Sequence, residues 1–133
     1  MALLLFACAP GLSACGETND QRDARRIVSR YYEALKRHDA RTACGLVSPA
    51  VADAMLRTSG EGGKPCVAGL RDLFRDVAAS AEPRFFDSVP TVAAASIHGN
   101  RAIVVIRKGL QQKHLTLTRV GGGWQITGSP DLR

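Results

Sequence analysis

The first half of the chain repeats apolar residues with the period of an α-helix. Ile27, Tyr31 and Leu35 recur every four residues, which predicts a helix from Asp20 to His38. Further helices are expected where a capping residue or a proline precedes another periodic stretch. They are Ala40 to Leu46 after Asp39, Pro49 to about Arg57 after Ser48, and a helix opened by Pro65 and ended by Pro83.

The second half has the two-residue period of β-strands. Leu115 and Leu117 alternate with polar residues between Lys113 and Val120, so one face of that strand is expected to be buried. Gly99-Asn100 is a hairpin turn signal. The expected strands are Val89 to His98, Arg101 to Arg107, Lys113 to Val120 and Trp124 to Thr127. Helices followed by an antiparallel meander predict an α+β domain, with helices packed on a curved antiparallel sheet.

Composition limits the size and the partners of this domain. A chain of 133 residues has room for one domain, and only 5% of it is aromatic, so we expect a core of Val, Ile, Leu and Ala. The formal net charge of +6 suits an anionic partner. Lys113 and Arg101 do not form a basic patch with aromatic residues, so no nucleic acid is expected. Anionic lipid or an acidic wall polymer is the expected counter-charge.

The N-terminal segment is short, uncharged and apolar. Leu3 to Ala14 would form a helix of roughly 18 Å, too short to cross a hydrocarbon core of about 30 Å. We interpret it as the apolar region of a signal peptide that covers residues 1–14. No Lys or Arg precedes Leu3, where signal peptides normally carry positive charge. A buried N-terminal strand or helix is the alternative.

The end of this segment, Leu12-Ser13-Ala14-Cys15, resembles a lipobox. The resemblance implies cleavage before Cys15, a lipid on its thiol, and a protein exported to the outer face of the cell membrane. Residues 15–21 would then be the lipidated cysteine and its linker. Cys8 also follows an apolar stretch, but bulky Phe6 fits the small-residue position poorly, so Cys15 is preferred.

Assigning Cys8 to the signal peptide and Cys15 to the lipid leaves Cys44 and Cys66 as a pair. In an oxidising compartment, such a pair predicts a disulfide. A catalytic thiol is the alternative, and it would need a neighbouring histidine. The chain has no Cys-x-x-Cys, and its three histidines lack ligand spacing, so neither a metal nor a cofactor is expected.

Two stretches carry a family resemblance. Residues 30–39, Arg-Tyr-Tyr-Glu-Ala-Leu-Lys-Arg-His-Asp, are similar to the first helix of the cone-shaped domain of nuclear transport factor 2, ketosteroid isomerase and SnoaL-type cyclases. Residues 121–126, Gly-Gly-Gly-Trp-Gln-Ile, are similar to its last strand. The resemblance implies a cystatin-like roll over residues 22–129, with a tail at 130–133. Uncharacterised exported actinobacterial lipoproteins also resemble this arrangement, including the cysteine pair.

The resemblance bears on chemistry through Tyr31. It matches the tyrosine with which ketosteroid isomerases donate a hydrogen bond to the developing oxyanion. Those enzymes also need a carboxylate base, which the family places in an Asp-Pro segment. Asp53 is the only carboxylate on the corresponding helix and no Asp-Pro is present, so no catalytic residue is assigned.

A non-enzymatic envelope lipoprotein is therefore the preferred expectation. Its pocket would include Tyr31, Phe86 and Trp124, and would bind a small apolar ligand or an envelope protein partner. The alternative is a small isomerase- or cyclase-like enzyme that uses Tyr31. The sequence leaves open a homodimer through the sheet.

Basic residues also repeat on the first predicted helix. Arg22, Arg26 and Arg30 are four residues apart on one face, with Arg25 adjacent. Because this helix begins within a few residues of Cys15, we hypothesise that the arginines face anionic headgroups and orient the domain on the membrane. An ordinary solvated helix face is the alternative.

Overall fold

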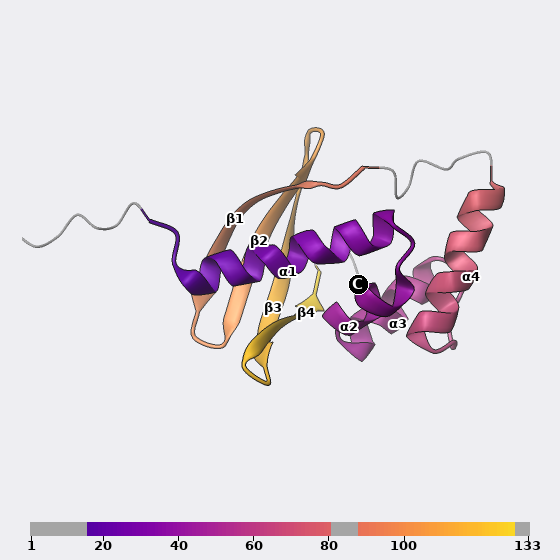
Figure 1. Ribbon diagram of the computed structural model, residues 1–133, viewed down its shortest axis with the longest axis horizontal. Helices are drawn as coiled ribbons and strands as arrows, with labels where there is room; N and C mark the ends of the chain where they lie inside the picture. The colour runs from indigo at the N-terminus through magenta and orange to yellow at the C-terminus, as the bar shows by residue number, and fades with distance from the viewer. Residues whose placement is uncertain (1–15, 81–87, 130–133) are drawn as a thin grey trace, which may run out of the picture.

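The computed structural model describes residues 16–80 and 88–129, which form four helices and a four-stranded antiparallel sheet (Figure 1). The helices are α1 (Asn19–Lys36), α2 (Ala40–Leu46), α3 (Pro49–Thr58) and α4 (Cys66–Ala79), and the strands are β1 (Thr91–His98), β2 (Arg101–Lys108), β3 (Gln111–Val120) and β4 (Gly123–Gly128). This arrangement confirms the predicted α+β class. The predicted signal peptide at 1–14, Cys15, Phe86 and the tail at 130–133 lie outside the described residues.

Helix α1 begins at a capping box formed by Thr18 and Gln21. The Thr18 hydroxyl accepts a hydrogen bond from the Gln21 amide at 3.2 Å, and the Gln21 side chain accepts one from the Thr18 amide at 2.8 Å. The helix therefore starts at Asn19, one residue before the prediction, and the end of the expected linker is helical. It stops at Lys36 rather than at the predicted His38, whose φ of 57° lies in the left-handed region that ends helices.

The next two helices start at the predicted caps. The Asp39 carboxylate accepts a hydrogen bond from the Thr42 amide at 3.1 Å, and the Ser48 hydroxyl accepts one from the Val51 amide at 3.3 Å. Helix α4 begins at Cys66, directly after Pro65, where the proline needs no amide partner. Within the described ranges, none of the helices is both long and apolar enough to span a membrane.

A disulfide between Cys44 and Cys66 joins α2 to the start of α4, with 6.0 Å between their Cα atoms. It confirms the predicted pair. A second contact lies further along α4, where the His38 ring stacks on Phe74 with ring centroids 4.7 Å apart. The turn between α1 and α2 is therefore packed against α4.

The sheet is an antiparallel meander with the order β1-β2-β3-β4. The predicted turn at Gly99-Asn100 joins β1 to β2, and Val104 lies opposite Leu115 in the register of β2 and β3. Leu115 and Leu117 are buried, which confirms the predicted alternation in β3. The buried face of the last three strands consists of Ala102, Val104, Ile106, Leu115, Leu117, Trp124 and Ile126.

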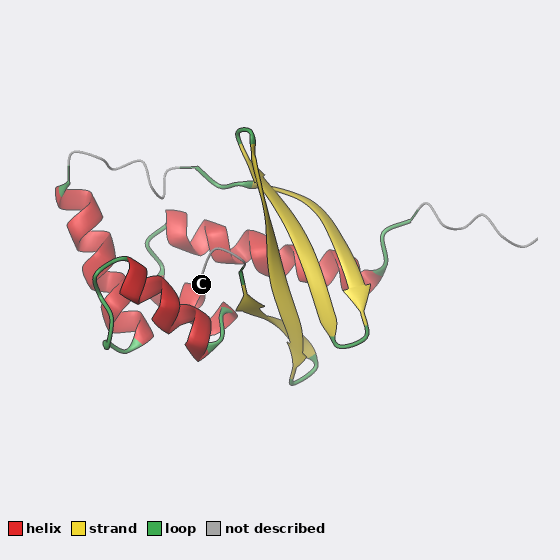
Figure 2. Ribbon diagram, turned by 180° about the vertical axis from the view of Figure 1, so that it is seen from behind, coloured by secondary structure: helices red, strands yellow, loops and turns green. Residues whose placement is uncertain are grey.

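Helix α1 lies across this buried face, while α2, α3 and α4 gather at one end of the sheet (Figures 1 and 2). Ala24 and Val28 in the N-terminal half of α1 are completely buried, and small side chains there let the helix approach the sheet closely. In its C-terminal half the buried side chains include the larger Tyr31 and Leu35. Two cavities are lined by residues of this half of the helix.

Candidate ligand pocket

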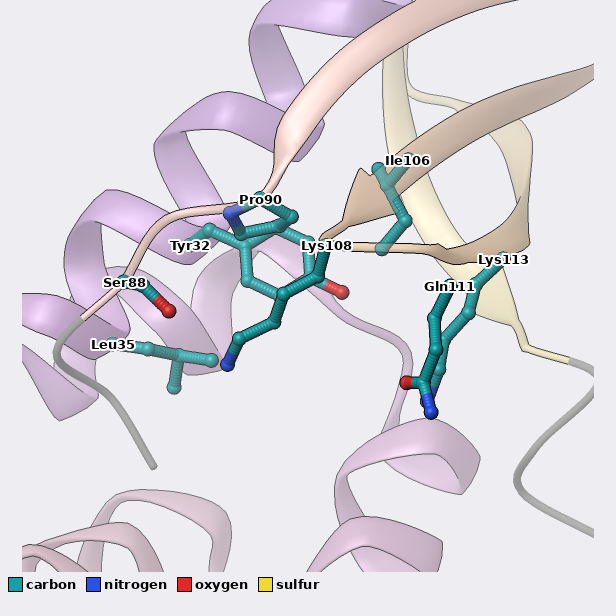
Figure 3. Close-up of a pocket in the computed structure, with 8 residues that line it drawn as sticks. All are labelled: Tyr32, Leu35, Ser88, Pro90, Ile106, Lys108, Gln111 and Lys113. Atoms are coloured by element: carbon teal, nitrogen blue, oxygen red, sulfur yellow. The ribbon is translucent and has the colours of Figure 1, made fainter. Parts of the chain in front are cut away.

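A cavity of about 350 Å³ lies between the C-terminal half of α1 and the hairpin formed by β2 and β3. Its volume is within the range of small-molecule sites. Carbon atoms form most of its wall, and at least half of its lining residues carry a polar or charged group. The lining residues are Tyr32, Leu35, Ser88, Pro90, Ile106, Lys108, Gln111 and Lys113 (Figure 3).

A second cavity, of about 160 Å³, adjoins the first. The two share Tyr32 and Lys113, so these side chains stand between them. The remaining lining residues come from α1, α3, the sheet and the residue that follows β4, and are Tyr31, Val51, Met55, Leu115, Ile126 and Ser129. The apolar space therefore continues from the hairpin toward α3.

The polar end of the pocket comes from the hairpin. Lys108 lies opposite Gln111 in the register, and Lys113 lies opposite Ile106. Lys113 and Gln111 face inward because they are in phase with the buried Leu115. In Figure 3, Lys108 extends toward Leu35 while Gln111 and Lys113 lie side by side. Neither cavity has an acidic or histidine side chain among its described lining residues, so the charge that these residues contribute is cationic.

Tyr31 belongs to the wall of the smaller cavity and is only 8% exposed. Its hydroxyl donates a hydrogen bond to the Met55 sulfur at 3.2 Å. Burial, with a smaller contribution from Tyr32, raises the pKa of Tyr31 well above its ordinary value. Tyr31 therefore stays protonated near neutral pH, and its proton points to a thioether.

Trp124 is placed in the core between the sheet and α1. The Arg119 guanidinium lies over its ring, 4.3 Å from the centroid, and donates to Asp20 of α1 at 3.0 Å. The residues that line the two cavities do not include Trp124. Of the three residues predicted to share a pocket, the structure thus places Tyr31 in a cavity wall and Trp124 in a packing role, while Phe86 is outside the described residues.

Arg22, Arg26 and Arg30 are exposed on α1, whereas the adjacent Arg25 is partly buried. Arg25 turns toward the sheet, where it donates to the Val92 carbonyl at 3.1 Å and pairs with Glu17 at 2.8 Å. Arg22 also lies near Glu17, at 3.9 Å, and Arg26 pairs with Asp23 at 3.6 Å. A groove on the outer side of α1 contains Arg26, Ser29, Arg30, Glu33, Ala34, Arg37, Asp39 and Thr42. The groove mixes both charges, so it is no purely basic site.

Carboxylates elsewhere are engaged in ion pairs away from the cavities. Asp53 pairs with Arg57 one turn along α3 and is not among the described residues that line either cavity. Lys64 binds Asp72 at 2.8 Å and also contacts Glu61, which fixes the loop before α4 onto that helix. These hydrogen bonds raise the pKa of Lys64 and lower that of Asp72. The described residues contain no cluster of His, Cys, Asp or Glu able to hold a metal ion.

The sequence contained one signal for the pocket that the prediction did not use. Lys113 has the same phase as Leu115 and Leu117, so a charged side chain had to point to the buried side of the sheet. Tyr32, Lys108 and Gln111 gave no comparable signal, because their position depends on how the hairpin meets α1. No family model, curated protein or solved structure matches the chain, so the family resemblance stays a prediction.

Proposed function

We propose that the chain is an exported, lipid-anchored protein that binds a small amphipathic anion in the pocket between α1 and the β2–β3 hairpin. The observation that carries the proposal is the combination in one cavity of apolar walls with Lys108 and Lys113. An apolar ligand body would displace water from Leu35, Pro90 and Ile106. Its acidic group would lie at the lysines.

Charge favours an anion over a neutral or cationic ligand. Between Ser88 and Ser129 the chain has no Asp or Glu, but it has Lys108, Lys113 and three arginines. The sheet thus carries positive charge into a cavity whose described lining has no acid. Lys108 and Lys113 are exposed in the structure. A ligand that covers them removes their cations partly from water, and an opposite charge at hydrogen-bond distance offsets that cost.

The enzyme alternative has one supporting observation, which is that Tyr31 lines a cavity. Its hydroxyl proton is directed to Met55. An isomerase or cyclase also needs a base to move a proton, and the described residues around Tyr31 offer no carboxylate or imidazole. Binding without catalysis is the function that this geometry supports better.

Two features support export and anchoring. The apolar segment at 1–14 ends in the lipobox-like sequence before Cys15, and the Cys44–Cys66 disulfide suits an oxidising compartment. Metabolic labelling with a fatty acid tests the anchor. Label should be present in the wild-type protein and lost in Cys15→Ser, and label that persists in the variant would contradict the assignment.

Calorimetric titration with octanoate and octanol tests the pocket, because the two probes share an apolar chain and differ in charge. Octanoate should bind at least about tenfold more tightly, since a charge-assisted hydrogen bond is worth about 1.5–3 kcal/mol. Lys108→Gln should remove most of that preference. Lys36→Gln, which changes an exposed lysine of α1 outside the cavity, is the matched control. Equal binding of the two probes would refute the proposed anion site.

A further inference from the structure

The β2–β3 hairpin ends in a tip that combines an exposed leucine with cations. The tip projects beyond the helices in both overall views (Figures 1 and 2). Leu110 at its end is 107% exposed, far more than Val120, the other exposed large apolar residue in the described part of the chain. A single exposed apolar residue is ordinary on a protein surface, so Leu110 supports a binding role only together with the residues around it.

Turn geometry does not explain the leucine. Lys108 and Gln111 are the last paired residues, so Gly109 and Leu110 make a two-residue turn. Gly109 has a φ of 59° and satisfies the need for a positive φ, whereas Leu110 has a negative φ that any residue adopts. A polar residue would therefore fit at position 110 without strain, and the leucine serves something other than the turn.

Cations surround the apolar tip on both faces of the hairpin. Arg107 points to the outer face of the sheet, opposite to the inward side chains of its neighbours in β2. Its guanidinium donates to the Gln112 side chain at 3.4 Å, which holds it beside the tip. Lys108 and Lys113 stand on the inner face at the cavity. No acidic residue occurs in the hairpin or elsewhere between Ser88 and Ser129.

We infer that this tip docks on the surface of an anionic phospholipid bilayer. Leu110 would enter the boundary between headgroups and acyl chains, with Arg107 at the level of the phosphates. A second copy of the chain is the poorer occupant, because two tips would bring like charges together. Nucleic acid is also poorer, because the tip has no aromatic ring on which a base would stack.

Docking has a consequence for the pocket, and this one step rests on the proposed function. Lys108, Gln111 and Lys113 belong both to the hairpin and to the cavity wall. A docked tip therefore brings the cavity close to the bilayer, and an anionic amphiphile would pass between them with little exposure of its apolar part to water.

Co-sedimentation with vesicles tests the docking, using the full chain with Cys15→Ser so that no lipid is attached. Vesicles of phosphatidylglycerol and phosphatidylcholine should bind the protein, and vesicles of phosphatidylcholine alone should bind it much less. Binding should fall when salt is raised from about 0.05 M to about 0.5 M, because added ions screen charges at the surface. Residues 1–15 are the same in all variants, so any affinity of that segment cancels when variants are compared.

Leu110→Gln should lower the vesicle partition coefficient at least about fivefold, and Arg107→Gln about fivefold at low salt. Val120→Gln is the matched control, since it removes an exposed apolar residue from the other end of β3 and should change partitioning less than about twofold. A Leu110→Trp variant adds a direct reading of depth, because its emission should be quenched by lipids brominated on the acyl chain.

The docking is overturned if Leu110→Gln binds anionic vesicles as well as the wild type does. It is also overturned if Val120→Gln loses as much vesicle binding as Leu110→Gln. Equal binding to neutral and anionic vesicles also overturns it. Octanoate titration of the same variants separates the two proposals, because Leu110→Gln should leave octanoate binding unchanged. Failure of octanoate binding with intact vesicle binding would remove the proposed pocket function and leave the docking standing.

Discussion

Reduction of the Cys44–Cys66 disulfide should destabilise the protein by an amount that the loop length sets. The bond joins residues that are 22 apart in sequence. Closing a loop of that size removes entropy from the unfolded chain worth about 3 kcal/mol at 25 °C. For a domain of this size, that loss corresponds to a fall of about 12 °C in Tm. In the unfolded and reduced chain, Cys44 and Cys66 are linked only through the residues of α3 and its loops. The two cysteines can then move far apart, and the disulfide removes that freedom.

Urea denaturation of oxidised and reduced wild-type protein, followed by circular dichroism, measures this difference. Reduction leaves both side chains in place, so the comparison isolates the cross-link from packing. The double variant Cys44→Ala with Cys66→Ala is the control, and its stability should not respond to reductant. A free energy of unfolding that is the same in oxidised and reduced wild type would refute the reasoning, and so would a reductant effect of equal size in the double variant.

Three further predictions concern packing and charge. Leu117→Ala should cost about 2–5 kcal/mol of unfolding free energy, because the side chain is fully buried, whereas Val120→Ala should change it by less than about 0.5 kcal/mol. A hydrogen bond to Glu61 raises the pKa of Asp76. This hydrogen bond therefore stabilises the folded protein below the ordinary pKa of an Asp side chain, and the stabilisation is lost as the pH rises through the raised pKa of Asp76. Asp76→Asn, whose amide always donates, should therefore flatten the dependence of Tm on pH above about 4, and an unchanged profile would contradict this. Tyr31→Phe should leave octanoate binding within about threefold of wild type if the tyrosine only packs, and a complete loss would favour a chemical role.

Helix starts were predicted well because they depend on local interactions. Asp39 and Ser48 each cap an amide three residues ahead, and residues this close along the chain meet whatever the rest of the fold does. The start of α1 was placed one residue late, since the capping box at Thr18 was not recognised. Strand boundaries near Gly99-Asn100 were correct for the same local reason, because the turn residues select the hairpin.

The pocket was predicted less well, because cavity walls are assembled from residues far apart in sequence. Arg25 looked like part of a basic stripe, yet it turns to the Val92 carbonyl 67 residues away. Trp124 looked like a pocket residue, yet Arg119 and α1 cover it. Neither contact leaves a periodic trace in the sequence.

The sequence alone determined the order of helices and strands, the buried face of β3 and the cysteine pair. These follow from period, capping and the even number of cysteines left after Cys8 and Cys15 are assigned, all of which are properties of residue type and spacing. Only the tertiary structure decided which side chains line a cavity, because the cavity walls combine residues from elements far apart in sequence. It also decided that Leu110 is held in solvent among cations, because exposure depends on which elements pack around a residue and not on the residue itself.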